Sequence, residues 1–560
     1  MKLEKILIVG GVAGGASTAA RARRMSETAE IVMFEKGPFV SFSNCGLPYH
    51  ISGEIKTEEE LILMTPEKFI AQYRIDARVN NEVVKVNSSN KTVTIKNVVT
   101  GENYEEGYDK LVISPGAYAF VPPFEGLDKI DSFTLKTVPD VVGIMNFLKS
   151  SNAKHITVVG GGFIGLEAAE NLKIHGVEVT LIEGADQIIP FVDKEMSYFG
   201  QKELIAKGIK VLVNEMVEKF DTNKVILKSG KEITTDGVIL AIGVKPDTAF
   251  LKDSGIKMND AGYMLVNDNY QTNIEDIYAC GDAILVKNAL SGQMVPLSMA
   301  GPANKQGKLI ADHMFGMKIM NKGYIGSGIV KLFDINIACT GLNEKQLKDT
   351  NISYDVTYVA PPGIVGIMPG GHLVFTKLIW EKGTGKILGM QCASSGASDK
   401  RVDIIATAIK GNMTIWDLPD LEFCYAPTFG TGKDVVNKVG YVACNVEEKA
   451  FKQVPFTKVY GLLNDNAQIF DIREIDEYAA GRIDGIPNVP MSVIRDRLSE
   501  LDKSQPVYVH CRTGERSYKI SVALDLLGYN AVNIAGSYEF TKVFEEMECY
   551  NDATRKNIMK

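Results

Sequence analysis

The sequence predicts an α/β protein with two nucleotide-binding domains, an α+β domain and a smaller C-terminal α/β domain. An apolar strand, a glycine turn and a helix occur near residue 6 and again near residue 156, and each unit leads to a strand that ends in an acid. From about Tyr324 the glycine turns stop, and alternating strands such as HLVFTKLIW take over. The first pattern is typical of nucleotide-binding α/β domains, and the second favours an α+β arrangement.

The composition fits a globular protein without a nucleic-acid or membrane partner. Of the 560 residues, 45% are hydrophobic and 23% are charged, and the net charge of −8 argues against a nucleic-acid binder. The apolar run Ile6 to Val9 enters a glycine turn, which indicates a buried strand rather than a signal peptide. No apolar stretch reaches the roughly 18 residues of a membrane span, so a cytoplasmic location is expected.

The eight cysteines do not predict a disulfide scaffold, because they are widely spaced and include no CxxC pair. No metal site is expected. Most of the cysteines are interpreted as small buried hydrophobic residues, and only Cys45 and Cys511 have unusual neighbours.

The first glycine turn predicts an FAD site. Gly10, Val12 and Gly15 occupy the three fingerprint positions, and Val12 breaks the strict GxGxxG pattern. A helix N-terminus after such a turn binds phosphate, and Glu35, about 20 residues later, is placed to bind a ribose hydroxyl. Asp282, at the end of a later strand, suits the ribityl or pyrophosphate region of a flavin. The residues predicted to contact FAD are Gly10, Gly11, Val12, Gly14, Gly15, Glu35, Lys36 and Asp282.

The second glycine turn predicts an NADH site. Its GxGxxG pattern is intact, follows a strand and opens a helix. Glu183 ends the next strand, where it would accept from both ribose hydroxyls of NAD and repel the extra phosphate of NADP. An aromatic ring at Phe163 could stack on a flavin and move aside for nicotinamide. The residues predicted to contact NADH are Gly160, Gly162, Phe163, Gly165 and Glu183.

Cys45 is the candidate redox residue. It lies in SFSNCGLPYH, after the second strand of the first domain, where a helix is expected to begin near Gly46. A helix N-terminus lowers the pKa of a thiol, and flanking Ser43 and Asn44 could add hydrogen bonds. The sequence therefore predicts a reactive thiolate at this position.

Residues 1 to about 445 resemble the pyridine nucleotide-disulfide oxidoreductase superfamily, and within it the coenzyme A-disulfide reductase branch, whose mark is SFxNCGLPY. The resemblance implies two Rossmann-like domains, for FAD and NAD, and an α+β dimerisation domain that forms a homodimer. Two-cysteine members carry CxxxxC, but this chain has His50 at the second position. The resemblance therefore implies that Cys45 alternates between a thiolate and a mixed disulfide, persulfide or sulfenic acid.

The same resemblance implies a coenzyme A site. The matching positions are Ser17, Arg21, Arg24, Ser41, Asn44, Asn304 and Lys433. Arg21 and Arg24, three residues apart, share one helix face and could hold phosphates, or could simply form a solvated basic face. Tyr425 matches a tyrosine that the family supplies from the partner subunit. A second family tyrosine is replaced by Ile367, which favours a persulfide or polysulfide over coenzyme A disulfide.

The C-terminal segment resembles a rhodanese domain, on DIREIDEYAAGRIDGIPNVP followed by PVYVHCRTGERS. The loop residues Cys511, Arg512, Thr513, Gly514, Glu515 and Arg516 enter a helix, and their N–H groups would converge on the cysteine sulfur. Arg512 and Arg516 are expected to add positive charge. Cysteine phosphatases have five residues between the cysteine and the arginine, so the four here favour a sulfur atom over a phosphate, while an inactive rhodanese fold stays an alternative.

The predicted domains are an FAD-binding domain at 1–112 and 248–323, a NAD-binding domain at 113–247, a dimerisation domain at 324–445, a linker at 446–459 and a rhodanese domain at 460–560. Together they predict an NADH- and FAD-dependent sulfur reductase. Its catalytic residues would be Cys45, Cys511, which carries sulfane sulfur, and Tyr425. The alternatives are an NADH oxidase or peroxidase that uses a Cys45 sulfenic acid, and a coenzyme A- or sulfur-responsive binding protein with little turnover.

Overall fold

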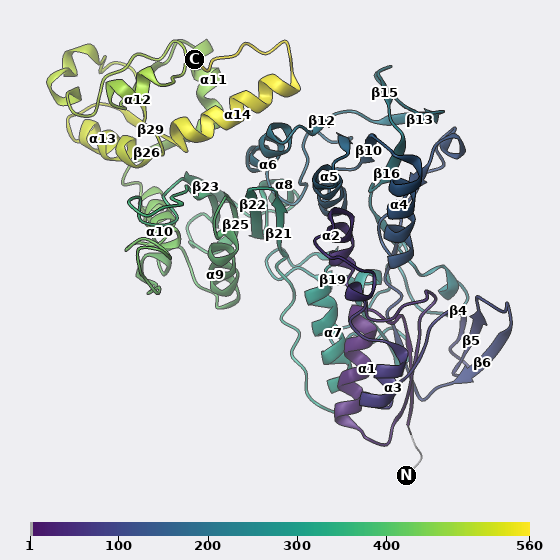
Figure 1. Cartoon of the computed structure of the whole chain (residues 1–560). Helices are drawn as coiled ribbons and strands as arrows, with labels where there is room; N and C mark the ends of the chain where they lie inside the picture. The colour runs from purple at the N-terminus through teal and green to yellow at the C-terminus, as the bar shows by residue number, and fades with distance from the viewer. Residues whose placement is uncertain (1–3) are drawn as a thin grey trace. The chain divides into compact units, whose positions relative to one another are not determined.

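The computed structural model describes residues 4–560 and confirms the predicted α/β fold class. The described chain divides into two compact units, whose elements are labelled in Figure 1. The first unit contains residues 4–182 and Met216–Tyr324, and the second contains Glu183–Glu215 and Ile325–Lys560.

A five-stranded parallel sheet forms the centre of the first nucleotide-binding domain. Its strands, in spatial order, are β18 (Ile277–Ala279), β7 (Lys110–Ile113), β1 (Lys5–Val9), β2 (Glu30–Phe34) and β3 (Asp76–Arg78). The strands are uniformly apolar because both faces of such a sheet are covered. Ile6, Leu7 and Ile8 accordingly have no exposed surface.

Helices α1 (Ala13–Met25) and α7 (Ala300–Met314) pack against each other beside this sheet (Figure 1). The glycine turn allows α1 to come this close to the strand ends. A Cβ at Gly15 would lie 1.9 Å from the Gly10 carbonyl oxygen, so no larger residue fits there. The shorter helices α2 (Leu47–Ser52) and α3 (Pro66–Tyr73) complete the segment after β2.

The second nucleotide-binding domain repeats the pattern. Within the first unit its strands are ordered β11 (Glu178–Ile182), β10 (His155–Val159), β16 (Gly237–Leu240) and β9 (Ser132–Phe133), with helices α4 (Val138–Ser151) and α5 (Phe163–His175). The short strands β8 (Ala117–Ala119) and β17 (Val244–Pro246) form an antiparallel pair in the same unit.

Small antiparallel sheets complete the first unit. They are β4 (Asn81–Asn87), β5 (Thr92–Asn97) and β6 (Asn103–Gly107); β13 (Val217–Asp221), β14 (Lys224–Leu227) and β15 (Glu232–Thr234); and β19 (Leu285–Lys287) with β20 (Met294–Pro296).

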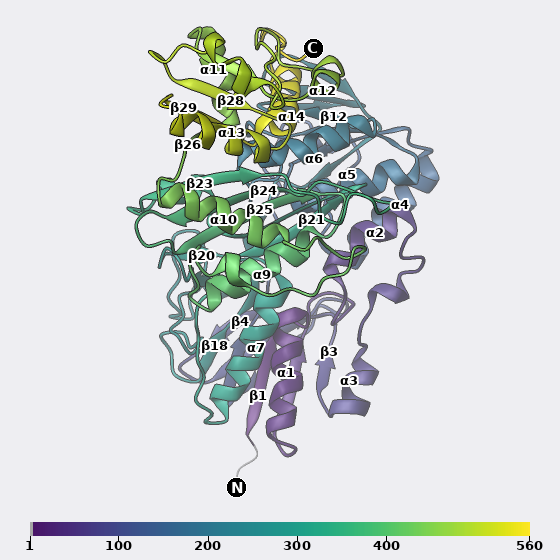
Figure 2. The ribbon, with the colours of Figure 1, turned by 90° about the vertical axis from the view of Figure 1, so that its left-hand side faces the viewer.

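The second unit is built on an antiparallel sheet. Its order is β21 (Ser327–Leu332), β22 (Ile335–Gly341), β25 (Ile387–Ser394), β24 (Phe375–Glu381) and β23 (Tyr354–Val359). Helices α9 (Ser398–Lys410) and α10 (Val435–Glu447) cover one face (Figure 2), and α8 (Glu344–Lys348) follows β22. This is the α+β domain that the sequence predicts.

The segment Glu183–Glu215 packs with this sheet as part of the second unit. It contains α6 (Lys194–Ala206) and β12 (Lys210–Leu212). On α6, the Phe199 ring lies 4.3 Å from that of Phe375 on β24, centroid to centroid. The Lys377 ammonium, which is fully buried, pairs with Asp193, Glu195 and Glu344. An aromatic contact and a buried ion cluster therefore attach this segment to the sheet.

The C-terminal domain has a parallel sheet of order β26 (Lys452–Pro455), β29 (Ala531–Ala535), β28 (Val507–His510) and β27 (Gln468–Asp471). Its helices are α11 (Val459–Asn464), α12 (Ile475–Ala479), α13 (Glu515–Leu526) and α14 (Ser537–Asn551). The predicted linker at 446–459 was therefore wrong in part, since it supplies β26 and the start of α11. That polar run carries too little apolar periodicity to reveal an edge strand.

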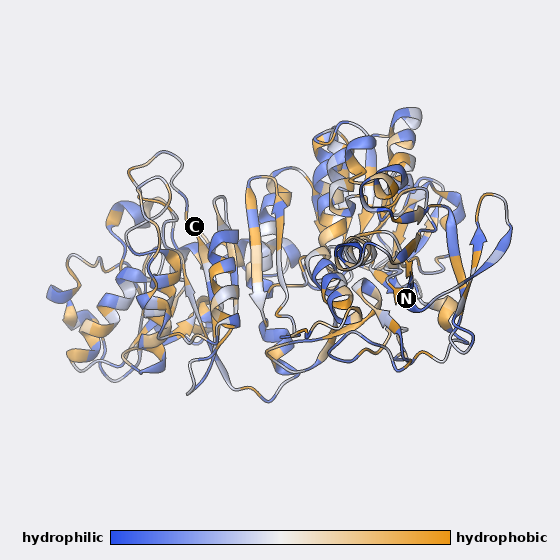
Figure 3. Ribbon diagram, turned by 90° about the horizontal axis from the view of Figure 1, so that it is seen from below, coloured by the Kyte–Doolittle hydropathy of each residue, from blue (hydrophilic) through white to orange (hydrophobic). Residues whose placement is uncertain are grey.

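The longer helices alternate hydrophilic and hydrophobic residues along their length (Figure 3), as expected where one face packs on a sheet. Among the residues described, 4–560, no helix has both the length and the hydrophobicity needed to span a bilayer.

Candidate active site

The first glycine turn has the features of a dinucleotide site. Helix α1 begins at Ala13 without a side-chain cap, so its first N–H groups can donate to a phosphate. The Glu35 carboxylate accepts from the backbone N–H of Gly11 and of Gly37, each at 2.9 Å. Burial raises the pKa of Glu35, and the two N–H groups lower it. Glu35 thus holds the turn and keeps lone pairs for a ribose hydroxyl, which fits FAD.

Two further residues predicted to contact FAD are in ion pairs. Lys36 pairs with Asp247, which follows β17. Asp282 lies 3.3 Å from the Lys136 ammonium, carboxylate oxygen to nitrogen. FAD, when bound, would supply the chemistry that accepts a hydride from a nicotinamide and passes two electrons to a sulfur.

The second glycine turn has the same construction. Gly162 caps α5 without a side-chain hydrogen bond, and a Cβ at Gly165 would lie 1.9 Å from the Gly160 carbonyl oxygen. Phe163 is half-buried and opens the helix. Glu183 directly follows β11, and its carboxylate accepts from the Ala185 N–H at 2.7 Å. The turn and its helix fit a nicotinamide dinucleotide.

Cys45 lies in a short 3₁₀ turn, Asn44–Gly46, directly before α2. Its side chain is exposed in the protein chain. The neighbouring Asn44 side chain donates to the Lys136 carbonyl oxygen at 3.2 Å, which ties the turn to the segment before α4. His50, at the position of the second family cysteine, is buried, and its ring nitrogen lies 2.9 Å from the Ile55 carbonyl oxygen. Cys45 therefore has no thiol partner at that position.

The expectation that the protein alone favours a Cys45 thiolate was wrong. Desolvation and then the nearby Glu167 carboxylate raise the pKa of Cys45, while Lys136 lowers it. The short α2 helix does not offset these effects. The macrodipole of a helix this short is weak, and the predicted hydrogen bond from Asn44 goes to a carbonyl instead.

Glu167 is a site residue that sequence reasoning missed. It lies on α5, and desolvation followed by repulsion from Glu170 raises its pKa to about 7. Tyr49, beside the same carboxylates, has its pKa raised to about 12, first by desolvation. An acid two residues after the last fingerprint glycine, inside an apolar helix, was the available signal.

Replacing Glu167 by Gln is expected to lower the pKa of Cys45. Above about pH 7 Glu167 is ionised and opposes the thiolate, and glutamine removes that charge. The pH midpoint for alkylation of Cys45 by iodoacetamide, followed by peptide mass spectrometry, should fall. Glu178→Gln, which removes an exposed acid on β11, serves as the control and should leave the midpoint in place. A midpoint that rises in Glu167→Gln contradicts the assignment.

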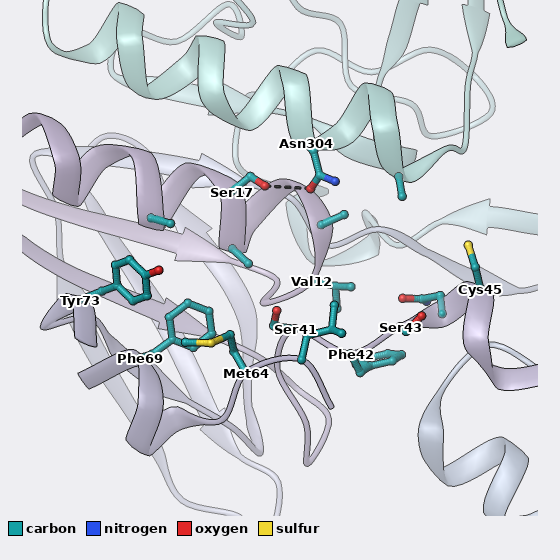
Figure 4. Close-up of a pocket in the computed structure, with 16 residues that line it drawn as sticks. Val12, Ser17, Ser41, Phe42, Ser43, Cys45, Met64, Phe69, Tyr73 and Asn304 are labelled. Carbon is teal, nitrogen blue, oxygen red and sulfur yellow. Dashed lines mark hydrogen bonds between the residues drawn. The ribbon is translucent and has the colours of Figure 1, made fainter. Parts of the chain in front are cut away.

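A cavity of about 330 Å³ begins at Cys45 (Figure 4). Four residues of the predicted coenzyme A site line it, and the Ser17 hydroxyl donates to the Asn304 side chain at 2.8 Å. Figure 4 shows Tyr73, Phe69 and Met64 at the end away from Cys45, and these apolar residues were missed. The predicted residues that line the cavity are Ser17, Ser41, Asn44 and Asn304.

The two predicted arginines of this site do not line the cavity. Arg21 forms an ion pair with Asp312, in which Arg21 Nε lies 2.6 Å from the carboxylate oxygen. Arg24 is exposed. The spacing on α1 identified their shared face but gave no sign of the acid on α7 that pairs with Arg21.

In the second unit, Tyr425 and Lys433 line one cavity of about 460 Å³. The Tyr425 side chain is 55% exposed, and Ile367 is 88% exposed. The Lys433 ammonium lies 5.5 Å from the centroid of the Tyr441 ring. The loops that carry these residues thus present aromatic and apolar side chains to solvent.

Cys511 lies at the end of β28 and is 1% exposed. The Gly514 N–H donates to its sulfur at 3.1 Å, and the Ser517 hydroxyl donates at 3.4 Å. The converging loop that the sequence predicts is therefore present, and the Gly514 N–H and the Ser517 hydroxyl donate to the sulfur.

The two loop arginines each pair with an acid from another segment, which partly offsets the positive charge that the sequence predicts, and Arg516 also interacts with the Cys511 sulfur. The Arg512 side chain pairs with Glu539 at 2.8 Å, and Arg516 makes two bonds to Glu477, at 2.6 and 2.7 Å. The hydrogen bond to Glu477 has the largest effect and raises the pKa of Arg516. Burial lowers this pKa, and the nearby Cys511 sulfur raises it again. Sequence spacing could not show these acids, because both come from other segments.

Three carboxylates in the second unit, from Asp193, Glu195 and Glu344, lie close enough together to suggest a metal site. The Lys377 ammonium already pairs with all three. Their role is therefore to hold a buried lysine.

These sites define a flavin- and nicotinamide-dependent oxidoreductase with an accessible cysteine, joined to a second domain that cradles a cysteine sulfur. The chain belongs to the pyridine nucleotide-disulphide oxidoreductase family, whose model matches residues 4–306. The family's dimerisation domain matches residues 328–434, and a rhodanese-like domain matches residues 456–540.

Similar proteins support the same family assignment. The coenzyme A disulfide reductase of Staphylococcus epidermidis is 34% identical over 447 residues, which are 79% of this chain and all of that protein. The crystal structure of reduced Bacillus anthracis CoADR-RHD is 41% identical, has a TM-score of 0.95, and covers 98% of this chain and 99% of that one. An NAD-dependent persulfide reductase from A. fulgidus is 31% identical, with a TM-score of 0.90 and coverage of 96% and 99%.

Proposed function

We propose that this protein uses NADH and FAD to reduce a sulfur–sulfur bond of a coenzyme A derivative at Cys45. The main observation is that one cavity holds Cys45 together with Ser17, Ser41, Asn44 and Asn304, four positions predicted to bind coenzyme A. The relatives support this reading: a coenzyme A disulfide reductase matches 79% of this chain, and the CoADR-RHD and NAD-dependent persulfide reductase structures cover 98% and 96% of it.

The lack of a second thiol sets the chemistry at Cys45. With coenzyme A persulfide, the Cys45 thiolate attacks the sulfur attached to coenzyme A and hydrosulfide leaves. Return of Cys45 to a thiolate and release of coenzyme A require two electrons and a proton, which FAD held at the first glycine turn and NADH at the second would supply. Because the protein itself raises the pKa of Cys45, binding of cofactor and substrate must help to form the thiolate.

We also propose a role for Cys511, the cysteine of the rhodanese domain. Cys511 would carry sulfane sulfur and supply the reductase site through coenzyme A or directly. The Gly514 N–H and the Ser517 hydroxyl donate to its sulfur, and Arg516, which is paired with Glu477, also interacts with that sulfur; this environment suits a single transferred sulfur atom. We further propose a homodimer in which Tyr425 of the partner subunit reaches the reacting sulfur. The exposed Tyr425 and Ile367 support this arrangement.

The choice among acceptors is tested by anaerobic steady-state kinetics of the full-length, FAD-loaded protein. Coenzyme A persulfide, polysulfide, coenzyme A disulfide and, in a separate aerobic run, oxygen are compared. Persulfide is expected to give the highest kcat/KM, with one hydrosulfide released for each NADH oxidised. NADPH should be a poorer donor because Glu183 would repel its extra phosphate. NADH consumption that requires oxygen and ignores every sulfur acceptor would establish the oxidase alternative.

A further inference from the structure

Ser537, the first residue of α14, has an unusual backbone conformation. Its φ is +52°, and the residue before it, Gly536, has φ +82°. Residues with side chains rarely adopt this left-handed conformation, which glycine adopts without steric cost. Ser537 is also fully buried. A buried serine keeps a strained backbone, where glycine would fit without strain, only if its surroundings hold it there, and the contacts of its hydroxyl show what holds it.

The Ser537 hydroxyl contacts Cys511. It accepts from the Cys511 N–H at 3.3 Å and lies 4.0 Å from the Cys511 sulfur. It donates to the Ile534 carbonyl oxygen, at the end of β29, at 3.0 Å. Through these bonds the hydroxyl connects the start of the sulfur-binding loop to the neighbouring strand of the sheet.

A second buried hydroxyl completes the arrangement. Ser517 Oγ lies 3.3 Å from Ser537 Oγ and donates to the Cys511 sulfur at 3.4 Å. On the same loop, the Gly514 N–H donates to that sulfur at 3.1 Å. Because Cys511 is 1% exposed, little of its surface is open to a sulfur donor, and the direction of the sulfur therefore matters. The two serines are therefore placed to fix the direction of the sulfur.

The backbone at the start of α14 reinforces this position. The Tyr538 N–H donates to the Cys511 carbonyl oxygen at 3.0 Å, and the Glu539 N–H donates to the Arg512 carbonyl oxygen at 3.0 Å. These bonds do not need the Ser537 side chain. Removing the hydroxyl should thus change the hold on the sulfur while α14 keeps its contacts with the loop.

We propose that Ser537 is a positioning residue for sulfur transfer at Cys511, an inference that rests on the proposed carrier role of that cysteine. The Cys511 thiolate attacks the terminal sulfur of a low-molecular-weight persulfide, RS–SH. A bond forms between the two sulfurs and the RS–S bond breaks. The electron pair leaves with RS⁻, and the proton remains on the transferred sulfur. Ser537 and Ser517 keep the Cys511 sulfur directed for this attack and for the reverse transfer.

The test measures how fast Cys511 takes up sulfur from coenzyme A persulfide, in the full-length protein, by quenched reactions and mass spectrometry. Ser537→Gly removes the hydroxyl and relieves the backbone, while Ser537→Ala removes the hydroxyl and keeps the strain. Each should lower the limiting transfer rate roughly 3- to 10-fold, as expected for loss of the hydrogen bond between the hydroxyl and the Cys511 N–H, and leave the half-saturating concentration unchanged. Only Ser537→Gly should match or exceed the wild-type melting temperature.

Asn466→Gly is the matched control, since Asn466 is an exposed residue of the same domain with φ +53°. It should leave sulfur uptake unchanged. The inference is overturned if Ser537→Gly takes up sulfur at the wild-type rate, or if Ser537→Ala does so while Ser537→Gly is slow, because backbone strain alone would then explain the effect. Failure of wild-type Cys511 to take up any sulfur would instead refute the carrier role, and the inference with it.

Discussion

Replacement of Cys45 by serine is expected to abolish NADH-dependent reduction of persulfide and coenzyme A disulfide. The loss should be about a thousandfold or more, as is typical when an enzyme loses its nucleophile. A serine hydroxyl forms no disulfide, and no second thiol is placed to substitute. The other cysteine of the first unit, Cys280, is fully buried, and burial raises its pKa to about 11. Anaerobic assays of NADH oxidation and hydrosulfide release measure the loss.

Two controls separate loss of chemistry from loss of structure. The Cys45→Ser protein should keep its bound flavin and still pass electrons from NADH to a dye that accepts them directly from the flavin. Cys549→Ser, at a half-buried cysteine on α14, should retain full turnover with sulfur substrates. If Cys45→Ser kept more than a few per cent of the wild-type rate, Cys45 would not be the reacting group.

The local parts of the fold could be predicted from the sequence. Both glycine turns lie between a strand and a helix as expected, because a tight turn before a helix depends on residues within a few positions of each other. Close packing explains the pattern: Gly15 and Gly165 each face a backbone carbonyl that excludes a Cβ. The resemblance to a known family also placed Ser17, Ser41, Asn44 and Asn304, which line one cavity.

What could not be predicted depends on partners that are distant in the chain. Asp312, on α7, engages Arg21, and Glu477 and Glu539 engage the rhodanese-loop arginines. The effect of Glu167 on Cys45 depends on how α5 packs beside α2. In each case the spacing along the sequence identified one charged group but not the group that compensates it.

The packing of the C-terminal domain was also missed. Helix α14 lies beside α6 (Figure 1), where the Tyr198 hydroxyl bonds to Glu548 and Lys202 pairs with Glu546 at 2.6 Å. The Phe540 ring contacts the rings of Phe199 and Phe375, at centroid distances of 5.6 and 5.2 Å. Within the second unit the rhodanese domain is therefore fixed by a shared aromatic core and does not hang from a flexible linker.

Replacement of Lys377 by methionine is expected to destabilise the second unit by about 3–5 kcal/mol, because it would leave buried carboxylates without their cation. Burial by itself would lower the pKa of Lys377, but Glu195, Tyr358, Asp193 and Glu344 raise it well above its usual value, so the lysine stays charged. Desolvation already raises the pKa of Asp193. The two tryptophans of the chain, Trp380 and Trp416, both lie in the second unit, so tryptophan fluorescence during denaturation reports its unfolding.

The pH dependence of the stability of Lys377→Met distinguishes unpaired buried carboxylates from a simple loss of packing. Without Lys377 the carboxylates have raised pKa values in the folded protein, so folding binds protons and the variant gains stability relative to wild type as the pH falls. The loss in free energy of unfolding of Lys377→Met relative to wild type should be largest near pH 8 and should shrink towards pH 5. Lys202→Met breaks the more exposed pair with Glu546 and should cost about 1 kcal/mol or less. If both variants lose the same free energy of unfolding, or if the loss in Lys377→Met does not change with pH, the buried ion cluster does not hold residues 183–215 to the sheet.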